Sequence, residues 1–300
     1  MLPSLSIVIP SFRRTDLLRI CLASVIREMP AHTQVIVVDD GSSGEIVTRV
    51  AATFSGVQVI RHAHSKGFCA AANAGIRAAT GTIVELLNDD TEVCKGWADR
   101  ALQQFENAQI AAVAPLVLKN EPSRREAGFA PRIDSAGDVY DYGGFARKRG
   151  DGSVWDAASA YRQPGPVWGV SATAGFYRRQ VLLETGGFPE DFVAYFEDVD
   201  LSHRIRAAGY EIVYEPRSTV WHCVSASYGQ TPNRQLVERQ SRNEERVFWR
   251  NVRGRQRLRY LPRHIAVLGG KAIRRWQDGQ LLPWAFGRLR AILPGGSIRT

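Results

Sequence analysis

The sequence predicts an α/β fold in which a mainly parallel sheet carries helices on both faces and a helical extension follows. Three observations lead to this fold class. Short apolar runs alternate with stretches of helical periodicity over residues 1–88. The apolar runs are nearly continuous, as in strands that are buried on both faces. The last part of the chain is rich in arginine and differs in composition from the rest.

Four strands and three helices are expected in the first part of the chain. Apolar and β-branched runs that end in turn residues predict strands at 6–10, 34–40, 57–62 and 82–88. Apolar residues at helical spacing predict helices at 15–28, 43–54 and 66–80. The residues expected to cap these helices are Thr15, Ser43 and Ser65. In such a fold, ligands bind beyond the carboxyl ends of the strands.

The middle of the chain is expected to be irregular before regular structure resumes. Residues 120–165 are rich in glycine and aromatic residues without periodicity, which predicts long loops that serve a site. No role is assigned to the loop residues Asp138, Asp141 and Asp151. The pattern then predicts a strand pair within 165–179, a helix and turn within 181–192, a helix at 196–210, and the last strands at 211–222.

The C-terminal part is expected to be a basic amphipathic helix broken at Pro262, Gly269 and Pro283. The expected domains are therefore residues 1–235 and 236–300. Residues 238–300 contain 14 Arg and one Lys against three Glu and one Asp, a net charge of +11. Because the whole chain has a net charge of +9, residues 1–237 have a net charge of −2. The basic surface thus belongs to the tail.

Composition limits the class of protein. A chain of 300 residues with 44% hydrophobic content can bury a sizeable core. The four cysteines lack the spacing of a disulfide framework or a zinc site, which favours a reducing, cytoplasmic location. We expect no secretion signal, because the apolar run at the N-terminus has the length of a strand. No window has the roughly 18 uninterrupted apolar residues of a spanning helix.

Two adjacent carboxylates, Asp89 and Asp90, end the predicted strand at 82–88. The ends of the parallel strands, at 10–14, 39–42 and 88–91, should converge on one crevice. Adjacent anions repel each other, and a bound cation would relieve this repulsion. A plain turn, in which Asp90 or Thr91 caps the next helix, is the alternative that these residues leave open.

The sequence lacks the two common phosphate-binding loops. SFRRTD follows the first strand where a dinucleotide-binding fold has GxGxxG, and GxxxxGK[ST] does not occur. An α/β nucleotide site without such a loop needs another way to neutralise phosphate. A cation such as Mg²⁺ or Mn²⁺, held by one or two carboxylates and the phosphates of the substrate, provides one.

Several motifs occur in the order found in glycosyltransferase family 2. They are SIVIPSFRR, VVDDGSSGE, HSKGFCAAANAGI, LLNDDTEV and GGFPEDFVAYFEDVDLSHRIRAAGY, and together they extend over roughly residues 5–230. The chain resembles this family of inverting enzymes, and its rhamnosyltransferase-like members in particular. The resemblance implies a GT-A fold and transfer of a hexose from a nucleotide-diphosphate sugar to a hydroxyl of a saccharide or lipid-linked acceptor.

The resemblance also implies a donor site. Asp40 would contact the base of the sugar nucleotide, and the other residues implied to bind the donor are Pro10, Ser11, Phe12, Lys66, Gly67, Asn73, Asp89 and Trp168. Asp90 would contact the metal and the diphosphate as the last acid of a DxD-type motif whose first acid is replaced by Asn88. His222 aligns with a histidine that completes the metal site in related enzymes.

Two of these roles have plain alternatives. A histidine at a strand end, such as His222, is often a surface or hydrogen-bonded residue. In the family, the segment with Trp168 borders the donor sugar and acceptor, but a tryptophan before a small-residue run also fits the protein core. Neither alternative is excluded by the sequence.

The motif FEDVD implies that Asp198 is the catalytic base, with Glu197 beside it. An inverting transfer needs one carboxylate that takes the proton of the attacking hydroxyl. A carboxylate in the first turn of a helix is kept ionised by the helix dipole. Acidic residues also favour helix N-termini without any catalytic role. Three acids within four residues, Glu197, Asp198 and Asp200, are however more than the capping of one helix needs.

The basic tail suggests a membrane surface. Arginine clusters interleaved with aromatic residues, including Trp249, Trp276 and Trp284, are typical of segments that lie on anionic membranes. Such attachment predicts a peripheral enzyme on the inner face of the plasma membrane in cell-wall or polysaccharide synthesis. The alternative is a helical extension that packs on the catalytic domain or a second subunit. Nucleic-acid binding is not indicated, because no recognition fold is evident.

The predicted function is thus a metal-dependent inverting glycosyltransferase, with two alternatives. A sugar-phosphate nucleotidyltransferase also uses an α/β sheet and metal-bound acids. It usually has a glycine-rich loop after the first strand, which SFRRTD does not supply. A non-catalytic sugar-nucleotide-binding protein recruited to membranes by the tail is the other alternative.

Overall fold

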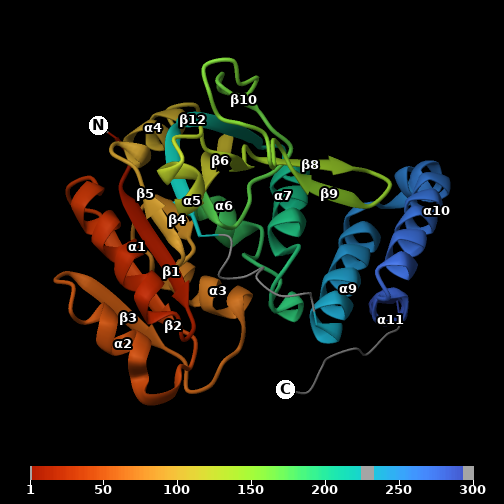
Figure 1. The fold of residues 1–300 in the computed structure, drawn as a ribbon, viewed down its shortest axis with the longest axis horizontal. Coiled ribbons are helices and arrows are strands. Elements are labelled where there is room, and N and C mark those ends of the chain that lie inside the picture. The colour runs from red at the N-terminus through yellow and green to blue at the C-terminus, as the bar shows by residue number, and fades with distance from the viewer. Residues whose placement is uncertain (1, 224–232, 293–300) are drawn as a thin grey trace.

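The computed structural model describes residues 2–223 and 233–292. A ten-stranded sheet forms its centre, with strand order β10-β12-β6-β11-β4-β1-β2-β3 and with β5 and β7 paired to β12 and β6 (Figure 1). Three C-terminal helices lie at the opposite end of the molecule from β3 (Figure 1). Residues 224–232 and 293–300, which the two expected domains include, lie outside the described residues.

The N-terminal half confirms the predicted parallel sheet. The strands β1 (Leu5–Ser11), β2 (Gln34–Asp39), β3 (Val57–Arg61) and β4 (Ile83–Leu87) pair in parallel in the order β4-β1-β2-β3. Alternate β1 residues pack on opposite faces: Val8 lies in one core with α3 (Phe68–Ala78), and Ile7 in the other with α1 (Thr15–Glu28) and α2 (Ile46–Ala51). Both faces are therefore covered, which explains the continuous apolar strands.

The predicted helix caps were wrong. Arg14 precedes α1, and no side chain caps that helix. Ser43 begins a short 3-10 turn, η1 (Ser43–Glu45), ahead of α2. Ser65 donates to the carboxylate of Asp40, and α3 begins after Gly67, whose φ is +92°. Each residue that could have been a cap is used by a tertiary contact or a turn, or lies inside the helix.

The second half contains a helix and a central strand that the sequence analysis did not predict. They are α4 (Trp97–Gln104) and β6 (Ile110–Lys119). The strand β11 (Ala174–Arg178) runs antiparallel between β4 and β6, and β12 (Glu211–His222) is one long strand parallel to β6. The predicted strand pair within 165–179 is therefore corrected, because β10 (Gly165–Pro166) pairs with β12 and not with β11.

The region expected to be long loops contains regular structure. Its elements are α5 (Pro122–Glu126), β7 (Ile133–Ser135) and the hairpin of β8 (Asp138–Asp141) and β9 (Phe145–Lys148). The strand β5 (Thr91–Val93) follows Asp90 directly, so no helix begins there. Figure 1 shows the β8–β9 hairpin reaching toward the C-terminal helices. Tertiary contacts therefore order strands that are too short for their periodicity to be detected.

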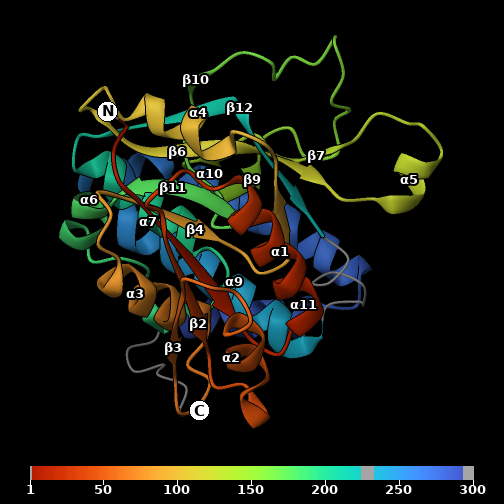
Figure 2. The same ribbon diagram turned by 90° about the vertical axis from the view of Figure 1, so that its left-hand side faces the viewer.

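Three helices form the C-terminal part: α9 (Arg234–Asn251), α10 (Gly254–Gln277) and α11 (Leu281–Ile292). The predicted breaks were wrong, because α10 continues through Pro262 and Gly269. Pro283 lies in the first turn of α11, where the missing N–H has no intrahelical partner to lose. The helix ends instead fall near Val252 and Asp278. In the view of Figure 2 these helices lie behind the sheet.

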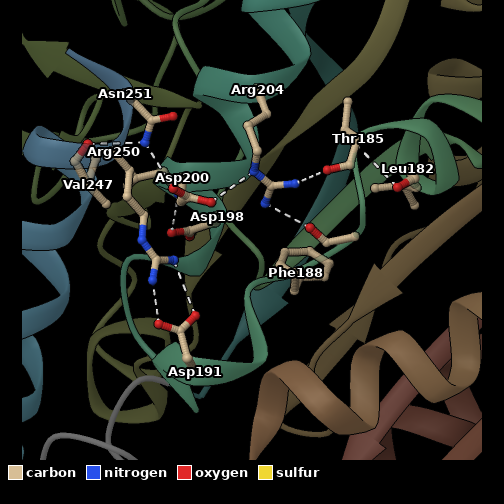
Figure 3. Close-up of polar contacts among 12 residues, drawn as sticks. Leu182, Thr185, Phe188, Asp191, Asp198, Asp200, Arg204, Val247, Arg250 and Asn251 are labelled. Atoms are coloured by element: carbon tan, nitrogen blue, oxygen red, sulfur yellow. Dashed lines mark hydrogen bonds and ion pairs between the residues drawn. The ribbon is translucent and has the colours of Figure 1, made fainter. Parts of the chain in front are cut away.

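The helix α9 packs on the segment around α6 (Arg179–Glu184), η2 (Glu190–Phe192) and α7 (Glu197–Ala207). Arg250 pairs with Asp191, and Asn251 donates to Asp200, which also binds Arg204 (Figure 3). In turn, Arg204 donates to the carbonyls of the turn after α6. Polar contacts thus connect α9 to the segment that contains the motif FEDVD.

None of the helices within the described ranges is both long and apolar enough to cross a membrane.

Candidate functional site

The loops after β1, β2 and β4 meet at one edge of the sheet, as predicted. The backbone N–H of Asp40 donates to the Ser11 carbonyl at 3.0 Å, and the Arg13 N–H donates to Ser42 Oγ at 3.1 Å. The Ser11 hydroxyl donates to Asp89 Oδ2 at 2.7 Å. The carboxyl ends of these three strands therefore form one connected surface.

Asp40 organises the loop that precedes α3. Its carboxylate lies 2.8 Å from His62 Nδ1 and accepts hydrogen bonds from Ser65 Oγ at 2.7 Å and from the backbone N–H groups of Lys66 and Gly67. The residue is only 4% exposed. Both of its oxygens are thus bound by the protein, and the predicted contact of Asp40 with a nucleotide base stays a prediction.

The other predicted donor residues differ in exposure. Pro10 and Ser11 are buried, whereas Phe12 and Lys66 are exposed. The guanidinium of Arg13 lies 4.6 Å from the centre of the Phe12 ring. Gly67 has a positive φ, and a Cβ at this position would lie 2.4 Å from Val193, so the loop needs glycine there. The exposed pair Phe12 and Lys66 is available for contact with a ligand.

Asn73 and Trp168 make contacts within the protein. Asn73 and the backbone of Phe188 exchange two hydrogen bonds of 2.8 Å, and its amide also donates to Glu190. Trp168 is partly buried and stacks on Tyr140 at 4.7 Å. The contacts of Asn73 stabilise the turn at residues 187–190. The stacking of Trp168 fits the alternative that this tryptophan belongs to the protein core.

Asp90 lies between a guanidinium and an imidazole. Its Oδ2 accepts a hydrogen bond from Arg14 Nη1 at 2.8 Å, and its Oδ1 lies 3.2 Å from His222 Nε2. The other ring nitrogen of His222 lies 3.0 Å from Asp134 Oδ2, which also accepts from Lys148 Nζ at 2.7 Å. The structure therefore brings the predicted pair Asp90 and His222 together, and it adds three residues to which the sequence analysis gave no role: Arg14, Asp134 and Lys148.

The geometry around Asp90 fits a divalent metal ion. Adjacent ligands of one octahedral ion, each about 2.1 Å from it, lie about 3 Å apart, close to the Asp90–His222 separation. Asp90 Oδ1 is buried without a hydrogen-bond partner. Asp134 orients His222 as carboxylates orient metal-bound histidines. No cluster of three such ligands occurs in the described part of the chain, so substrate oxygens would have to complete the coordination.

The charges around this pair keep Asp90 ionised. Burial alone would raise the pKa of Asp90, but the contacts with His222 and Arg14 outweigh it and hold the pKa below its ordinary value. Burial would likewise raise the pKa of Asp134, yet His222 and Lys148 lower it to about 2. Asp89 differs: burial raises its pKa to about 6 despite its bond from Ser11.

Glu197 and Asp198 begin α7 after a turn of unusual backbone conformation. Val193, Tyr195 and Phe196 all have positive φ values, of 66°, 74° and 66°. Such conformations cost about 1–3 kcal/mol each in non-glycine residues. The side-chain amide of Asn243 on α9, which is fully buried, donates to the carbonyls of Phe192, Ala194 and Tyr195 at 2.9 Å each. A residue of the C-terminal part therefore holds the turn that presents the acid pair.

The two acids differ in environment. Glu197 is buried, its Oε2 has no hydrogen-bond partner, and burial together with the charge of Asp198 raises its pKa to about 8. Asp198 is partly exposed and accepts hydrogen bonds from the N–H groups of Ala172 at 3.0 Å and Val199 at 2.8 Å. Burial raises the pKa of Asp198, and these two hydrogen bonds oppose it. Asp198 is partly exposed and oriented by two N–H groups, so it is better placed than the buried Glu197 to accept a proton from a ligand.

Asp198 lies close to the Asp90 cluster. Ala172 donates to Asp198, and the carbonyl of the next residue, Thr173, accepts from the N–H of Asn88 at the end of β4. Lys148, which is paired with Asp134, is also near enough to Asp198 to lower its pKa. The metal-ligand candidates and the candidate base are thus separated by one short segment of chain.

A cavity of about 510 Å³ opens beside Asp198. Its walls come from the start of α7, the β8–β9 hairpin and the helices α9, α10 and α11. We call it the Asp198 cavity; its lining includes Tyr195, Phe196, Arg147, Lys271 and Trp284. Asp40, Asp90 and His222 do not line it. The cavity is thus lined by the candidate base but by none of these three predicted site residues.

Comparison with known proteins identifies the family. The family model described as Glycosyl transferase family 2 matches residues 6–184, which is more than half of the chain. The pre-mycofactocin glycosyltransferase of Mycobacterium tuberculosis is 30% identical over 190 residues, covering 63% of this chain and 37% of that protein. The O-antigen biosynthesis protein RfbC of Myxococcus xanthus is 25% identical over 233 residues, covering 75% of this chain and 18% of RfbC.

A solved structure shows the same fold. The mannosyltransferase PcManGT from Pyrobaculum calidifontis, in complex with GDP-Man and Mn²⁺, has a TM-score of 0.62 and 16% sequence identity, covering 96% of this chain and 88% of that chain. The fold is therefore of the GT-A type, as the motifs implied. The chain spans only 25% and 37% of the length of the first curated relatives it matches.

We predict that Asn243→Ala loosens the turn before α7. Three carbonyls lose the hydrogen bond from the buried amide, so the free energy of unfolding should fall by about 2–4 kcal/mol. Hydrogen exchange of residues 192–198 should accelerate more than exchange elsewhere. Chemical denaturation and hydrogen-exchange mass spectrometry measure the two effects. The exposed Asn107→Ala is the matched control, and equal behaviour of the two variants would refute the role of Asn243.

Proposed function

Because the chain belongs to glycosyltransferase family 2, we propose that it transfers a hexose, with inversion, from a nucleotide-diphosphate sugar to a hydroxyl of a saccharide or lipid-linked acceptor. The observation that supports this proposal best is the position of Asp198. It is a partly exposed carboxylate on a cavity wall, with Ala172 and Thr173 between it and the strand end of Asp90.

In the proposed reaction, the acceptor hydroxyl attacks the anomeric carbon while its proton passes to Asp198. The bond from the anomeric carbon to the acceptor oxygen forms as the bond to the diphosphate oxygen breaks, and the electron pair leaves with the diphosphate. The N–H groups of Ala172 and Val199 fix the orientation of the carboxylate. Glu197 lies buried beside Asp198, and its raised pKa favours the protonated carboxyl, which cannot take this proton.

The donor diphosphate would lie near Asp90 and His222, which would hold Mg²⁺ or Mn²⁺. Such an ion neutralises the charge that develops on the leaving diphosphate. Ser11 at the end of β1 donates to the neighbouring Asp89, and Arg14 adds a positive charge beside Asp90. The exposed Phe12 and Lys66 are the best candidates for direct donor contacts.

The alternatives receive less support. A nucleotidyltransferase would need a phosphate-binding loop at SFRRTD, but Arg14 of this loop is paired with Asp90. A non-catalytic binding protein would not need a base on a cavity wall. The name of RfbC, an O-antigen biosynthesis protein, supports a role in polysaccharide synthesis. The rhamnosyltransferase-like assignment of the transferred sugar stays a prediction.

We expect Asp198→Asn to reduce donor turnover by about 10²- to 10⁴-fold, because the amide cannot accept the proton. Turnover is measured as release of nucleoside diphosphate from a panel of UDP-, GDP- and dTDP-hexoses. For the native protein, the rate should rise with pH through a pKa above the ordinary 3.8 of aspartate, since Asp198 must lose its proton to act as a base.

The affinity of Asp198→Asn for the nucleoside diphosphate should remain within about twofold of that of the native protein. This result would show that the variant is folded and that the loss lies in the chemical step. The exposed Asp156→Asn serves as the control, with turnover equal to that of the native protein. A fully active Asp198→Asn protein would eliminate the proposed base.

For the metal, we expect Asp134→Asn to weaken Mn²⁺ binding about 10- to 100-fold, because His222 loses the carboxylate that orients it. Binding of Mn²⁺ alone is measured by electron paramagnetic resonance of the free ion. Asp151→Asn removes a nearby exposed partner of Lys119 and should leave the affinity unchanged. Equal affinity in Asp134→Asn and the native protein would contradict the proposed ligand pair.

We further propose that α10 binds an anionic lipid surface. Leu258, Ile265 and Trp276 recur at helical spacing and are 75%, 61% and 71% exposed, so one side of α10 is an apolar stripe. Arg255 and Arg259 are exposed beside it. The net charge of +11 in residues 238–300 favours an anionic partner over a second copy of this basic helix. The stripe would hold the enzyme on the inner face of the plasma membrane.

Vesicles test this surface. We expect the native protein to sediment with vesicles containing phosphatidylglycerol, and less with pure phosphatidylcholine or at high salt. Replacing Leu258 and Trp276 by Ser should weaken binding at least about tenfold, since two buried apolar side chains are lost. Leu183→Ser changes an equally apolar, 41% exposed residue on α6 and should have no effect. No vesicle binding, or self-association through the stripe, would overturn the proposal.

A further inference from the structure

The charges of the Asp198 cavity point to the class of acceptor. We infer that the acceptor carries an anionic oxygen group, a phosphate or a carboxylate, which binds the arginines at the mouth of the cavity while its hydroxyl reaches Asp198. This inference rests on the proposed function and specifies its acceptor. It starts from the finding that the C-terminal helices, and not only the GT-A domain, build the walls around the candidate base.

The acids within the cavity leave little negative charge to repel an anion. Asp138 is buried, and burial together with the charge of Asp198 raises its pKa well above the ordinary value, which favours the uncharged carboxyl. Glu244 on α9 pairs with Lys271 of α10 and Arg288 of α11. These ion pairs neutralise Glu244 and fix the three helices to one another. Asp198 is thus the main negative charge inside the cavity.

The mouth of the cavity has an excess of positive charge. Arg147 of β9 and Arg274 of α10 are both exposed, and neither guanidinium has an ion-pair or hydrogen-bond partner among the described residues. Arg275 donates to the neutral Gln280 and keeps its charge uncompensated. Asp278 is the opposing acid at this mouth. Three arginines from two elements therefore face one carboxylate, an arrangement suited to bidentate binding of phosphate or carboxylate.

The remaining lining suits a saccharide. Aromatic side chains of Tyr195, Phe196, Phe145 and Trp284 line the same cavity and offer flat surfaces for sugar rings. A volume of about 510 Å³ lies within the range of small-molecule sites. The anion-binding arginines and the base lie on the same cavity, so an acceptor with both groups would be held with its hydroxyl oriented.

Matched acceptor probes test this inference. Methyl glycoside, methyl glycuronide and glycosyl 1-phosphate, each in gluco, galacto and manno form, are titrated into the protein with saturation-transfer NMR as readout. We expect at least one anionic probe to bind about tenfold more tightly than its neutral counterpart. The double variant Arg147→Gln/Arg274→Gln should bring this preference to about twofold or less.

The double variant Arg49→Gln/Arg100→Gln removes the same charge from exposed positions on α2 and α4 and should keep the preference. A preference for glycuronide indicates an acidic saccharide, and one for glycosyl phosphate indicates a phosphorylated or lipid-diphosphate-linked acceptor; either supports the inference. Equal binding of neutral and anionic probes, no binding of any anionic probe, or a preference that survives in Arg147→Gln/Arg274→Gln overturns it. Failure of the proposed function would appear separately, as absence of donor turnover.

Discussion

The contact of Asn243 with the turn before α7 is the constraint on which the site depends. Three residues of that turn have positive φ, and the buried amide of Asn243 binds three carbonyls in it. Without these bonds, the backbone strain would favour another turn and another direction for Asp198. The C-terminal helices are therefore part of the proposed site, because α9 fixes the turn before Asp198 and residues of α10 and α11 line the cavity beside it.

The site separates two groups of acids by electrostatics. Arg14 and His222 hold the pKa of Asp90 down, so this carboxylate remains anionic and can attract a cation. Burial acts in the other direction on Glu197 and on the partly exposed Asp198, and it raises the pKa of both carboxyl groups. Environments that push the pKa values of carboxyl groups apart are how one site obtains both a charged ligand and a tuned base.

The sequence predicted the elements whose pattern is local. The helix α1 has the predicted bounds. The strands β1 to β4 agree with the predicted bounds within one residue at either end, because buried parallel strands are apolar throughout. Asp89, Asp90, Asp198 and His222 could be selected from motifs. The sequence pattern did not predict which residues of α9 are buried. Residues 241–245, SRNEE, are charged or polar and yet buried. Their partners lie far away in sequence, and periodicity cannot detect them.

The helix α10 contributes to both proposed surfaces, the apolar stripe that would bind lipid and the mouth of the Asp198 cavity. One side of this helix carries the exposed apolar residues Leu258 and Trp276, whereas Lys271 and Arg275 face the cavity of Asp198. Both surfaces belong to this one helix, which sets the angle between them. An enzyme bound to a lipid surface through the stripe would therefore present the cavity mouth at a constant orientation to that surface. An anionic acceptor held near the headgroups would then reach the arginines and the base without further rearrangement of the protein.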